Sequence, residues 1–200
     1  MNKKTPARPR LVVGISGASG VIYGIRMLQI LRNLDVESHL VMSKSAQVTL
    51  THETDMSIAD VKALADVNYA NTDIGAAISS GSFKVEGMVV APCSIKTLSE
   101  ISTGVTSSLL SRAADVNLKE RRRLVLMVRE TPLHLGHLRS MTAVTEAGAI
   151  VYPPVPAFYA RPASLEEMVD HSLGRVLDLF GFDAGTVRRW DPNASSPGAT

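Results

Sequence analysis

The chain alternates between two spacings of apolar residues, one typical of strands and one typical of helices. A short apolar run at 11–15 (LVVGI) indicates a buried strand, and Val21, Ile25, Leu28 and Leu31 then recur at the spacing of a single helix face. The same alternation continues along the chain. It predicts strands at 37–42, 87–91, 122–128 and 149–152, helical stretches up to about residue 66, and helices at 94–102, 107–119, 135–147 and 164–181.

Two of the predicted helices begin at a serine that is followed three residues later by an acid. Ser57 precedes Asp60, and Ser164 precedes Glu167, which is the pattern of a capping box. The region 67–86 is polar, rich in small residues and without a clear period, so it predicts a loop with one short helix and a candidate mobile flap. The predicted buried side of the helix at 135–147 consists of Leu135, Leu138, Met141 and Val144.

Strands separated by helices predict a single-domain, doubly wound parallel sheet, Rossmann-like or flavodoxin-like, with helices on both faces. Ligands of such folds bind beyond the carboxyl ends of the strands. The segments that follow the predicted strands are therefore the candidate site. They are rich in small, polar and charged residues and comprise 16–20, 43–44, 92–94, 129–131 and 153–161.

Length and composition predict one domain at 10–190, between a disordered leader at 1–9 and a disordered tail at 191–200. The chain has 200 residues, of which 45% are hydrophobic, enough for one core with two faces. A formal net charge of +2 does not indicate nucleic-acid binding. The basic cluster at 119–123 (KERRR) contains an acid and adjoins an apolar run, which is typical of a solvated helix end.

The single cysteine and the apolar runs bear on the location of the protein. Cys93 has no partner for an intrachain disulfide, and no apolar run approaches the roughly 18 residues that a bilayer requires. The basic start of the chain (MNKKTPARPR) leads into a segment broken by glycine and serine, unlike the core of a signal peptide. We therefore expect a cytoplasmic protein without a membrane span.

The turn after the first predicted strand is rich in glycine (GISGASG, 14–20). Its spacing is G-x-x-G-x-x-G, whereas dinucleotide-binding turns have G-x-G-x-x-G with an acid about 20 residues later. A helix N-terminus offers unpaired N–H groups, so the turn suits a phosphate of a different ligand. Ser19 and Ser43 place hydroxyls at helix starts, where a plain N-cap is the commoner role, and Glu53 is typical of a solvated surface acid.

Two segments after later strands also carry candidate chemistry. The motif APCSIKTLS places hydroxyls at the start of a helix, and its Cys93 is either a nucleophile or, more commonly, a small buried residue. Arg129 and Glu130 lie at the mouth of a buried strand, where they form either part of a site or a structural ion pair.

Histidines and aromatic residues give two weaker signals. His134 and His137 are three residues apart, but no third ligand at metal spacing accompanies them, so no metal site is predicted. The loop PPVPAFYARP holds Phe158 and Tyr159 among four prolines in a chain with only 4% aromatic residues. It predicts an aromatic wall on a stiff loop, with simple packing of the loop as the alternative.

Together these motifs resemble those of the UbiX flavin prenyltransferase family. The resemblance runs from Leu11 to Trp190 and rests on GISGASG, VMSKSA, the glutamate of THET, APCSIKTLS, RAADVNLKERR, RETPL, PAFYARP and the terminal RRW. Each motif is weak alone, but their shared order is very specific. The family joins a dimethylallyl group from dimethylallyl phosphate to N5 and C6 of reduced FMN, and the product is a cofactor for UbiD-type decarboxylases.

The resemblance implies roles for individual residues. It implies catalytic roles for Ser19, Glu53, Lys119 and Glu130, with Ser19 and Glu53 beside the reacting centre. It places dimethylallyl phosphate against Lys119, Glu130, Tyr159 and Arg175. It places FMN against Gly17, Ala18, Ser19, Ser43, Ser94, Ile95, Lys96, Thr97 and Arg129.

The implied site is chemically coherent without a metal. Allylic C–O cleavage needs cations to hold the leaving phosphate, and it needs an aromatic wall around the carbocation-like carbon. Glu53, Glu130 or the departing phosphate could accept the protons from N5 and C6. Family members form dodecamers with the site at subunit contacts, so we expect a homo-oligomer. Ser107, Ser108 and Ser140 stand near the expected contacts, at positions where many members carry asparagine.

Three alternatives come from other classes. An NAD(P)-dependent reductase could grip a ribose phosphate with Ser43-Lys44, but the chain lacks the Tyr-x-x-x-Lys pair and the glycine spacing. A flavin-dependent cysteine decarboxylase would need a catalytic histidine and an Asn-Met motif that we do not find. The third alternative is an FMN-binding accessory subunit of an aromatic acid decarboxylase without turnover of its own.

Overall fold

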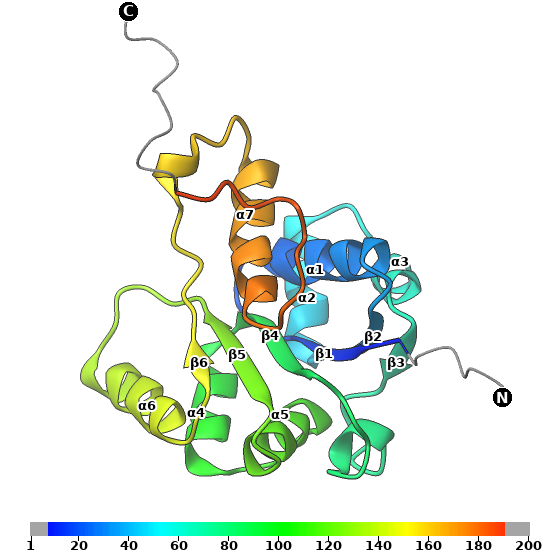
Figure 1. Ribbon diagram of the computed structural model, residues 1–200. Helices are drawn as coiled ribbons and strands as arrows, with labels where there is room; N and C mark the ends of the chain where they lie inside the picture. The colour runs from blue at the N-terminus through cyan, green and yellow to red at the C-terminus, as the bar shows by residue number, and fades with distance from the viewer. Residues whose placement is uncertain (1–7, 191–200) are drawn as a thin grey trace, which may run out of the picture.

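The computed structural model describes residues 8–190, which form one six-stranded sheet between two layers of helices (Figure 1). The strand order is β3-β2-β1-β4-β5-β6, and every pairing between neighbours is parallel. This is the order of a doubly wound fold, so the predicted fold class is confirmed. The strands are β1 (Arg10–Ile15), β2 (Glu37–Met42), β3 (Val67–Tyr69), β4 (Gly87–Cys93), β5 (Arg123–Val128) and β6 (Ile150–Val151).

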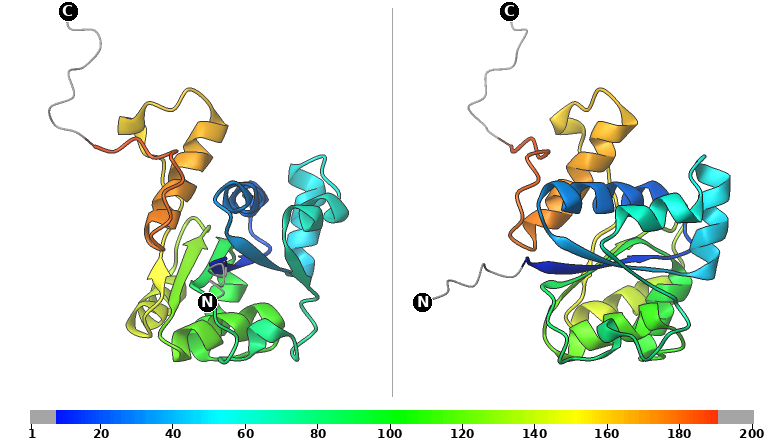
Figure 2. Two further views of the ribbon diagram at one scale, coloured as in Figure 1. Left: turned by 45° about the vertical axis from the view of Figure 1, so that its right-hand side comes forward. Right: turned by 90° about the vertical axis from the view of Figure 1, so that its right-hand side faces the viewer.

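The helices divide between the two faces of the sheet (Figure 2). One face carries α1 (Val21–Asn33), α2 (Lys44–Glu53), α3 (Ile58–Leu64) and α7 (Leu165–Asp178), and the other carries α4 (Ile95–Thr103), α5 (Leu109–Lys119) and α6 (Leu135–Glu146). Two short 3-10 helices, η1 (Ala77–Ser79) and η2 (Phe158–Ala160), lie in connecting loops. An apolar cluster fills each side of the sheet, which explains why β4, in the middle, is buried at every position.

The helix starts follow from side-chain caps. The capping box of Ser57 and Asp60 is formed as predicted, with bonds in both directions. At α7 only half of the predicted box forms. The Ser164 hydroxyl accepts from the backbone N–H of Glu167, but the Glu167 carboxylate accepts from the N–H of Ala163 instead of Ser164.

Two predictions about secondary structure and burial were wrong. The region predicted as a loop begins with β3, a strand of three residues at the sheet edge, although its predicted short helix is present as η1. On α6 only Val144 is buried, while Leu135 and Leu138 are 59% and 47% exposed. The neighbouring strand β6 has two residues, so the sheet under α6 is too small to cover that whole helix face.

Near the start of the described chain, Arg8 forms ion pairs with Asp35 and Asp66, and the carbonyl of Pro9 accepts from the N–H of Glu37. The predictions of disorder for 1–7 and 191–200 fall outside the described residues. Within 8–190 no helix has the length and apolar character needed to cross a membrane.

Candidate functional site

The carboxyl ends of four neighbouring strands are joined by a continuous set of hydrogen bonds. The buried hydroxyl of Ser16, after β1, donates to the carbonyl of Pro92 (2.8 Å) and accepts from the N–H of Ser94 (2.7 Å), after β4. The N–H of Ser43, after β2, donates to the carbonyl of Ile15. The N–H of Arg129, after β5, donates to the carbonyl of Cys93. The turns that the sequence predicted to meet are therefore held together at one edge.

The N-terminus of α1 is capped by Glu53, which lies at the far end of α2. Gly20 is the N-cap residue, with a left-handed φ of 96° that favours glycine, and it has no side chain to offer. The Glu53 carboxylate accepts from the N–H of Gly20 (2.8 Å) and of Val21 (3.0 Å). This position is possible because α2 stands across the carboxyl edge instead of lying along the sheet (Figure 2).

These contacts determine the charge of Glu53. Burial raises its pKa, but hydrogen bonds from the Ser19 hydroxyl and the N–H groups of Gly20 and Val21, together with the positive charge of Arg129, lower it more. The net pKa lies below the usual glutamate value, so this side chain is a carboxylate at neutral pH. The N–H groups at the start of α1, which the sequence suggested for a ligand phosphate, thus bind the carboxylate of Glu53 instead.

A cleft of about 670 Å³ opens beside this cap. Ser19, Gly20 and Tyr23 line one wall, the segment 128–131 lines the next, and the proline-rich segment 153–156 closes the cleft together with Leu165. The structure therefore brings together Ser19, Arg129 and Glu130, three of the predicted site residues. Among residues 8–190 no ion pair joins Arg129 to Glu130, which removes the structural reading of that pair.

Two further helix N-termini lie at the same edge and fit a phosphate group. Ser43 caps α2 by accepting from the N–H of Ala46, and Ser94 caps α4 by accepting from the N–H of Thr97. The Ser94 hydroxyl also donates to the Thr97 hydroxyl (3.2 Å). Hydroxyls and free N–H groups at the positive ends of two helices form the kind of donor set that phosphates occupy. Ile95 is half-buried beside them, while Lys96 extends into solvent and pairs with Glu100 (3.7 Å).

Gly17 and Ala18, the remaining predicted contacts of FMN, lie half-exposed in the turn after β1. A Cβ on Gly17 would lie 2.3 Å from the side chain of Ser45, so this glycine allows the turn to approach the start of α2 closely. The turn and the N-terminus of α2 therefore form one continuous surface next to the cleft.

Lys119, Tyr159 and Arg175 do not line this cleft. Lys119 is at the end of α5, which leads into the first residue of β5, so it lies at the opposite, amino edge of the sheet and pairs with Glu120. Tyr159 packs edge-on against His171 of α7, with ring centroids 5.8 Å apart. Arg175 is one helical turn beyond His171, so it shares a face of α7 with the position that Tyr159 covers.

Two aromatic residues near the site were not predicted from the sequence. Tyr23 lines the cleft, and burial raises its pKa while the charge of Arg129 lowers it in part. Burial also raises the pKa of Tyr152, which the positive charge of Arg175 lowers in part. Tyr152 directly precedes the segment 153–156 that closes the cleft. Tyr23 is in the first turn of α1, next to the glycine-rich segment, and this position was the sequence signal for a residue at the site.

Cys93 and the two histidines have structural surroundings. Cys93 is fully buried, and burial raises the pKa of its thiol, which matches packing and not nucleophilic attack. His134 caps α6 by accepting from the N–H of Gly136, and its ring lies 3.6 Å from that of His137 between centroids. Within 8–190 no three histidine, cysteine or acidic side chains gather at metal-binding distance.

Comparison with known proteins gives consistent matches. A family model described as Flavoprotein matches residues 2–176. The flavin prenyltransferase UbiX of Escherichia coli strain K12 is 63% identical over 172 residues, which cover 86% of this chain and 91% of that protein. The solved structure of AnUbiX (PadA1) in complex with FMN and dimethylallyl pyrophosphate has a TM-score of 0.91 at 54% identity, covering 92% of this chain and 98% of the other. A dodecameric FMN-dependent UbiX-like decarboxylase from Escherichia coli O157:H7 has a TM-score of 0.89 at 49% identity, covering 91% and 99%.

Proposed function

The chain belongs to the UbiX flavin prenyltransferase family, and on that premise we propose that it joins the dimethylallyl group of dimethylallyl phosphate to N5 and C6 of reduced FMN. The product, prenylated FMN, serves a UbiD-type decarboxylase. The observation that carries the proposal is the convergence, at one sheet edge, of two phosphate-binding helix N-termini with a cleft that contains Ser19, Arg129 and Glu130.

FMN binds with its phosphate at the N-termini of α2 and α4. Ser43, Ser94 and Thr97 supply hydroxyl donors there, and the positive ends of both helices favour the charge. The Glu53 carboxylate repels a phosphate from the N-terminus of α1, so Gly17, Ala18 and Ser19 contact the uncharged part of the ligand. When bound, reduced FMN supplies the nucleophilic N5 and C6 atoms. Arg129, which lines the cleft, would stabilise the negative charge of the reduced flavin.

The donor phosphate is bound by Lys119, Arg175 and Tyr159, which act at the cleft of a neighbouring subunit. Lys119 and the cleft lie at opposite edges of the same sheet, so one chain does not provide a complete site. A homo-oligomer, as in the dodecameric relative, brings them together. The two cations stabilise the leaving phosphate, and the aromatic rings of the 153–161 loop exclude water around the dimethylallyl carbon.

Glu53 is a poor candidate for the proton acceptor, which leaves Glu130 and the departing phosphate. Glu53 already accepts three hydrogen bonds and has a lowered pKa, which makes it a weak base. Glu130 accepts one, from the N–H of Thr131. A phosphate monoester has a second pKa of about 6, close to the working pH. Glu53 therefore acts mainly by holding the Ser19 hydroxyl and the α1 turn in place beside the reacting atoms.

The test is turnover by the purified oligomer. The protein is incubated anaerobically with reduced FMN and either dimethylallyl phosphate or the diphosphate, and the extracted flavin is examined by mass spectrometry. We expect a mass gain of one dimethylallyl unit with the monophosphate. Bound but unmodified FMN with both donors would identify a flavin-carrying subunit instead. Oxidation of NAD(P)H without bound flavin would identify a reductase. We further propose that the protein acts in the cytoplasm, which fractionation of the cells would test.

A further inference from the structure

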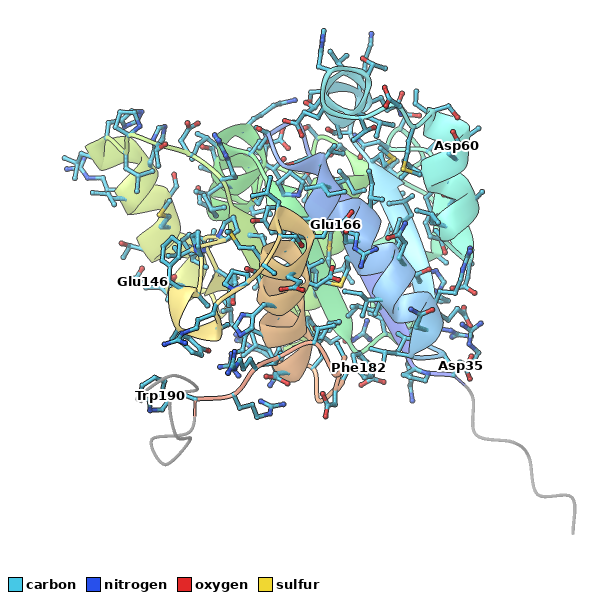
Figure 3. The ribbon with its side chains drawn as sticks, turned by 90° about the horizontal axis from the view of Figure 1, so that it is seen from above. Asp35, Asp60, Glu146, Glu166, Phe182 and Trp190 are labelled. Atoms are coloured by element: carbon cyan, nitrogen blue, oxygen red, sulfur yellow. The ribbon has the colours of Figure 1, made fainter. Side chains whose placement is uncertain are left out.

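The last described segment, residues 183–190, runs back along α7 and ends beside η2. We call it the C-terminal strap. Figure 1 shows it running beside α7, and Figure 3 labels Phe182, which directly precedes the strap, and Trp190, which ends it. The Trp190 ring meets the Tyr159 ring edge-on, with centroids 6.0 Å apart. The strap thus contacts the aromatic residue that the proposed function places at the donor.

Three polar contacts and one close approach attach the strap to α7. The His171 ring, whose residue is only 6% exposed, bonds through Nε2 to the carbonyl of Arg188 (3.3 Å). A carbonyl only accepts, so Nε2 carries the proton and donates. The Thr186 hydroxyl donates to the carbonyl of Asp170. A Cβ on Gly174 would lie 2.6 Å from the side chains of Thr186 and Val187, so glycine permits this contact.

Asp178 is the third polar anchor, and it is shared. Its two oxygens accept from both terminal nitrogens of Arg189 of the strap (3.0 Å each), and Oδ2 also accepts from Arg175 (2.7 Å). Asp178 is the last residue of α7, where a negative charge opposes the helix dipole. Its position is therefore unfavourable for the helix itself and is explained by the two arginines that it binds.

The strap is not held by a continuous apolar core. A cavity of about 360 Å³ lies between α7, the loop around η2 and the strap, and its lining includes Arg161, His171 and Arg188. Beside such a cavity the polar anchors carry much of the attachment. Removing one of them should release the strap locally and leave the sheet and its two apolar clusters unchanged.

We infer that His171 and Asp178 are positioning residues that clamp the C-terminal strap onto α7 and thereby hold Tyr159 and Arg175 in the geometry that binds the phosphate donor. The inference rests on the proposed function for the identity of that donor. His171 acts through Tyr159 and the strap backbone, and Asp178 acts by orienting Arg175 while Arg189 fixes Asp178 in turn. Neither residue is placed in contact with FMN.

The test combines a spectroscopic and a kinetic readout on the intact oligomer. Trp190 is the single tryptophan of the chain, so time-resolved fluorescence anisotropy reports on the strap alone. In Asp178→Asn and His171→Leu we expect a new nanosecond component from a released strap. We also expect the KM for dimethylallyl phosphate to rise about tenfold, equivalent to ~1.4 kcal/mol, with little change in kcat or in FMN affinity.

Two further variants serve as rescue and control. His171→Gln keeps an N–H donor for the Arg188 carbonyl and should restore most of the wild-type anisotropy and KM. Asp170→Asn removes a similar aspartate of α7, which pairs with Arg26 of α1 by two bonds, and should leave both readouts near wild type because its link to the strap is through its backbone carbonyl.

Three outcomes would overturn the inference: unchanged anisotropy in Asp178→Asn and His171→Leu, a released strap with an unchanged donor KM, or equal effects of Asp170→Asn. Wild-type protein that forms no prenylated flavin would instead overturn the proposed function, while the anisotropy measurements would still decide whether the two anchors hold the strap.

Discussion

Replacing Glu53 with glutamine separates its role in the fold from its role in the reaction. The amide keeps one oxygen that can accept from Gly20 or Val21, but it removes the negative charge at the N-terminus of α1 and weakens the bond from the Ser19 hydroxyl. Two effects follow. One is a loss of stability at the helix cap, and the other is a loss of order at Ser19, which the proposed function places beside the reacting atoms.

The structure allows the two effects to be sized. A capping side chain contributes about 1 kcal/mol, and a charge at a helix N-terminus about 0.3–1 kcal/mol when it is exposed, as Glu53 is. We therefore expect the free energy of unfolding of Glu53→Gln to fall by about 1 kcal/mol. Formation of prenylated flavin should slow by about a hundredfold, or ~2.7 kcal/mol, the scale for losing a preorganised electrostatic group at a reacting centre, with FMN binding nearly unchanged. The kinetic loss should thus exceed the stability loss.

Asp60 provides the matched control. It caps α3 by accepting from the N–H and hydroxyl of Ser57, has a lowered pKa for the same reason, and does not line the cleft. Asp60→Asn should lose similar stability in a urea titration and keep its turnover. Normal turnover of Glu53→Gln, or a defect confined to FMN affinity, would refute the reasoning and leave Glu130 or the departing phosphate as the important groups.

The pH dependence of the reaction follows from the direction of the Glu53 pKa. Because that pKa is lowered, Glu53 stays charged until the pH falls below the usual glutamate value of about 4.3. Its contribution to stability is fully present above that pH and is lost as the pH falls through the lower folded value. A loss of rate between pH 5 and 7 must therefore belong to another group, and Glu53→Gln should retain it. Rate profiles of wild type and variant test this directly.

Three other changes have defined outcomes. Ser16→Ala leaves the N–H of Ser94 without its buried partner, so the free energy of unfolding in urea should fall by about 1–3 kcal/mol. Lys119→Ala and Glu53→Gln should each be nearly inactive alone but should regain prenylation when their subunits are mixed. In the mixed oligomer some sites combine an intact Glu53 from one chain with an intact Lys119 from its neighbour. Absence of recovery would mean that Lys119 and Glu53 of one site belong to the same subunit. Cys93→Ala should keep substantial activity, because the thiol is buried and its pKa is raised, and loss of prenylation with FMN still bound would make it catalytic.

The parts of the fold set by local periodicity were predictable from the sequence. Strands with continuous apolar runs and helices with a clear apolar face, such as α1, were recognised with nearly correct bounds. The failures lie at the sheet edges, where periodicity carries less information. Three residues of β3 are too few to show a period, and the apolar face of α6 is genuine but has only the two-residue β6 beside it. Leu135 and Leu138 thus form an exposed apolar face of the kind that marks protein–protein contacts.

The location of the site was predictable, because ligands of doubly wound folds bind beyond the carboxyl ends of the strands. Strand order brings the segments after β1, β2, β4 and β5 to one edge, and this follows from strand–helix alternation alone. The partner of an individual side chain does not follow. Glu53 is 33 residues from Gly20, and their contact depends on the direction in which α2 leaves the sheet, which no local pattern encodes. The rule does not reach Lys119, which lies at the opposite edge of the sheet and which the proposed function assigns to the site of a neighbouring subunit.

The cap by Glu53 also changes what the glycine-rich turn means. Its spacing suggested an open anion-binding loop, but Gly17 makes room for Ser45, and Gly20 provides the left-handed residue at which α1 begins. Gly17 therefore lets the turn pack against α2, and Gly20 lets the chain enter α1. The carboxylate of Glu53 then neutralises the positive N-terminus of α1. A phosphate is then better stabilised at the N-termini of α2 and α4 than at that of α1, where the fixed negative charge of Glu53 would repel it. If the dimethylallyl carbon reacts beside this turn, as the proposed function has it, the fixed carboxylate of Glu53 also lowers the energy of a carbocation-like transition state. This electrostatic effect adds to its role in holding Ser19 and requires no proton transfer.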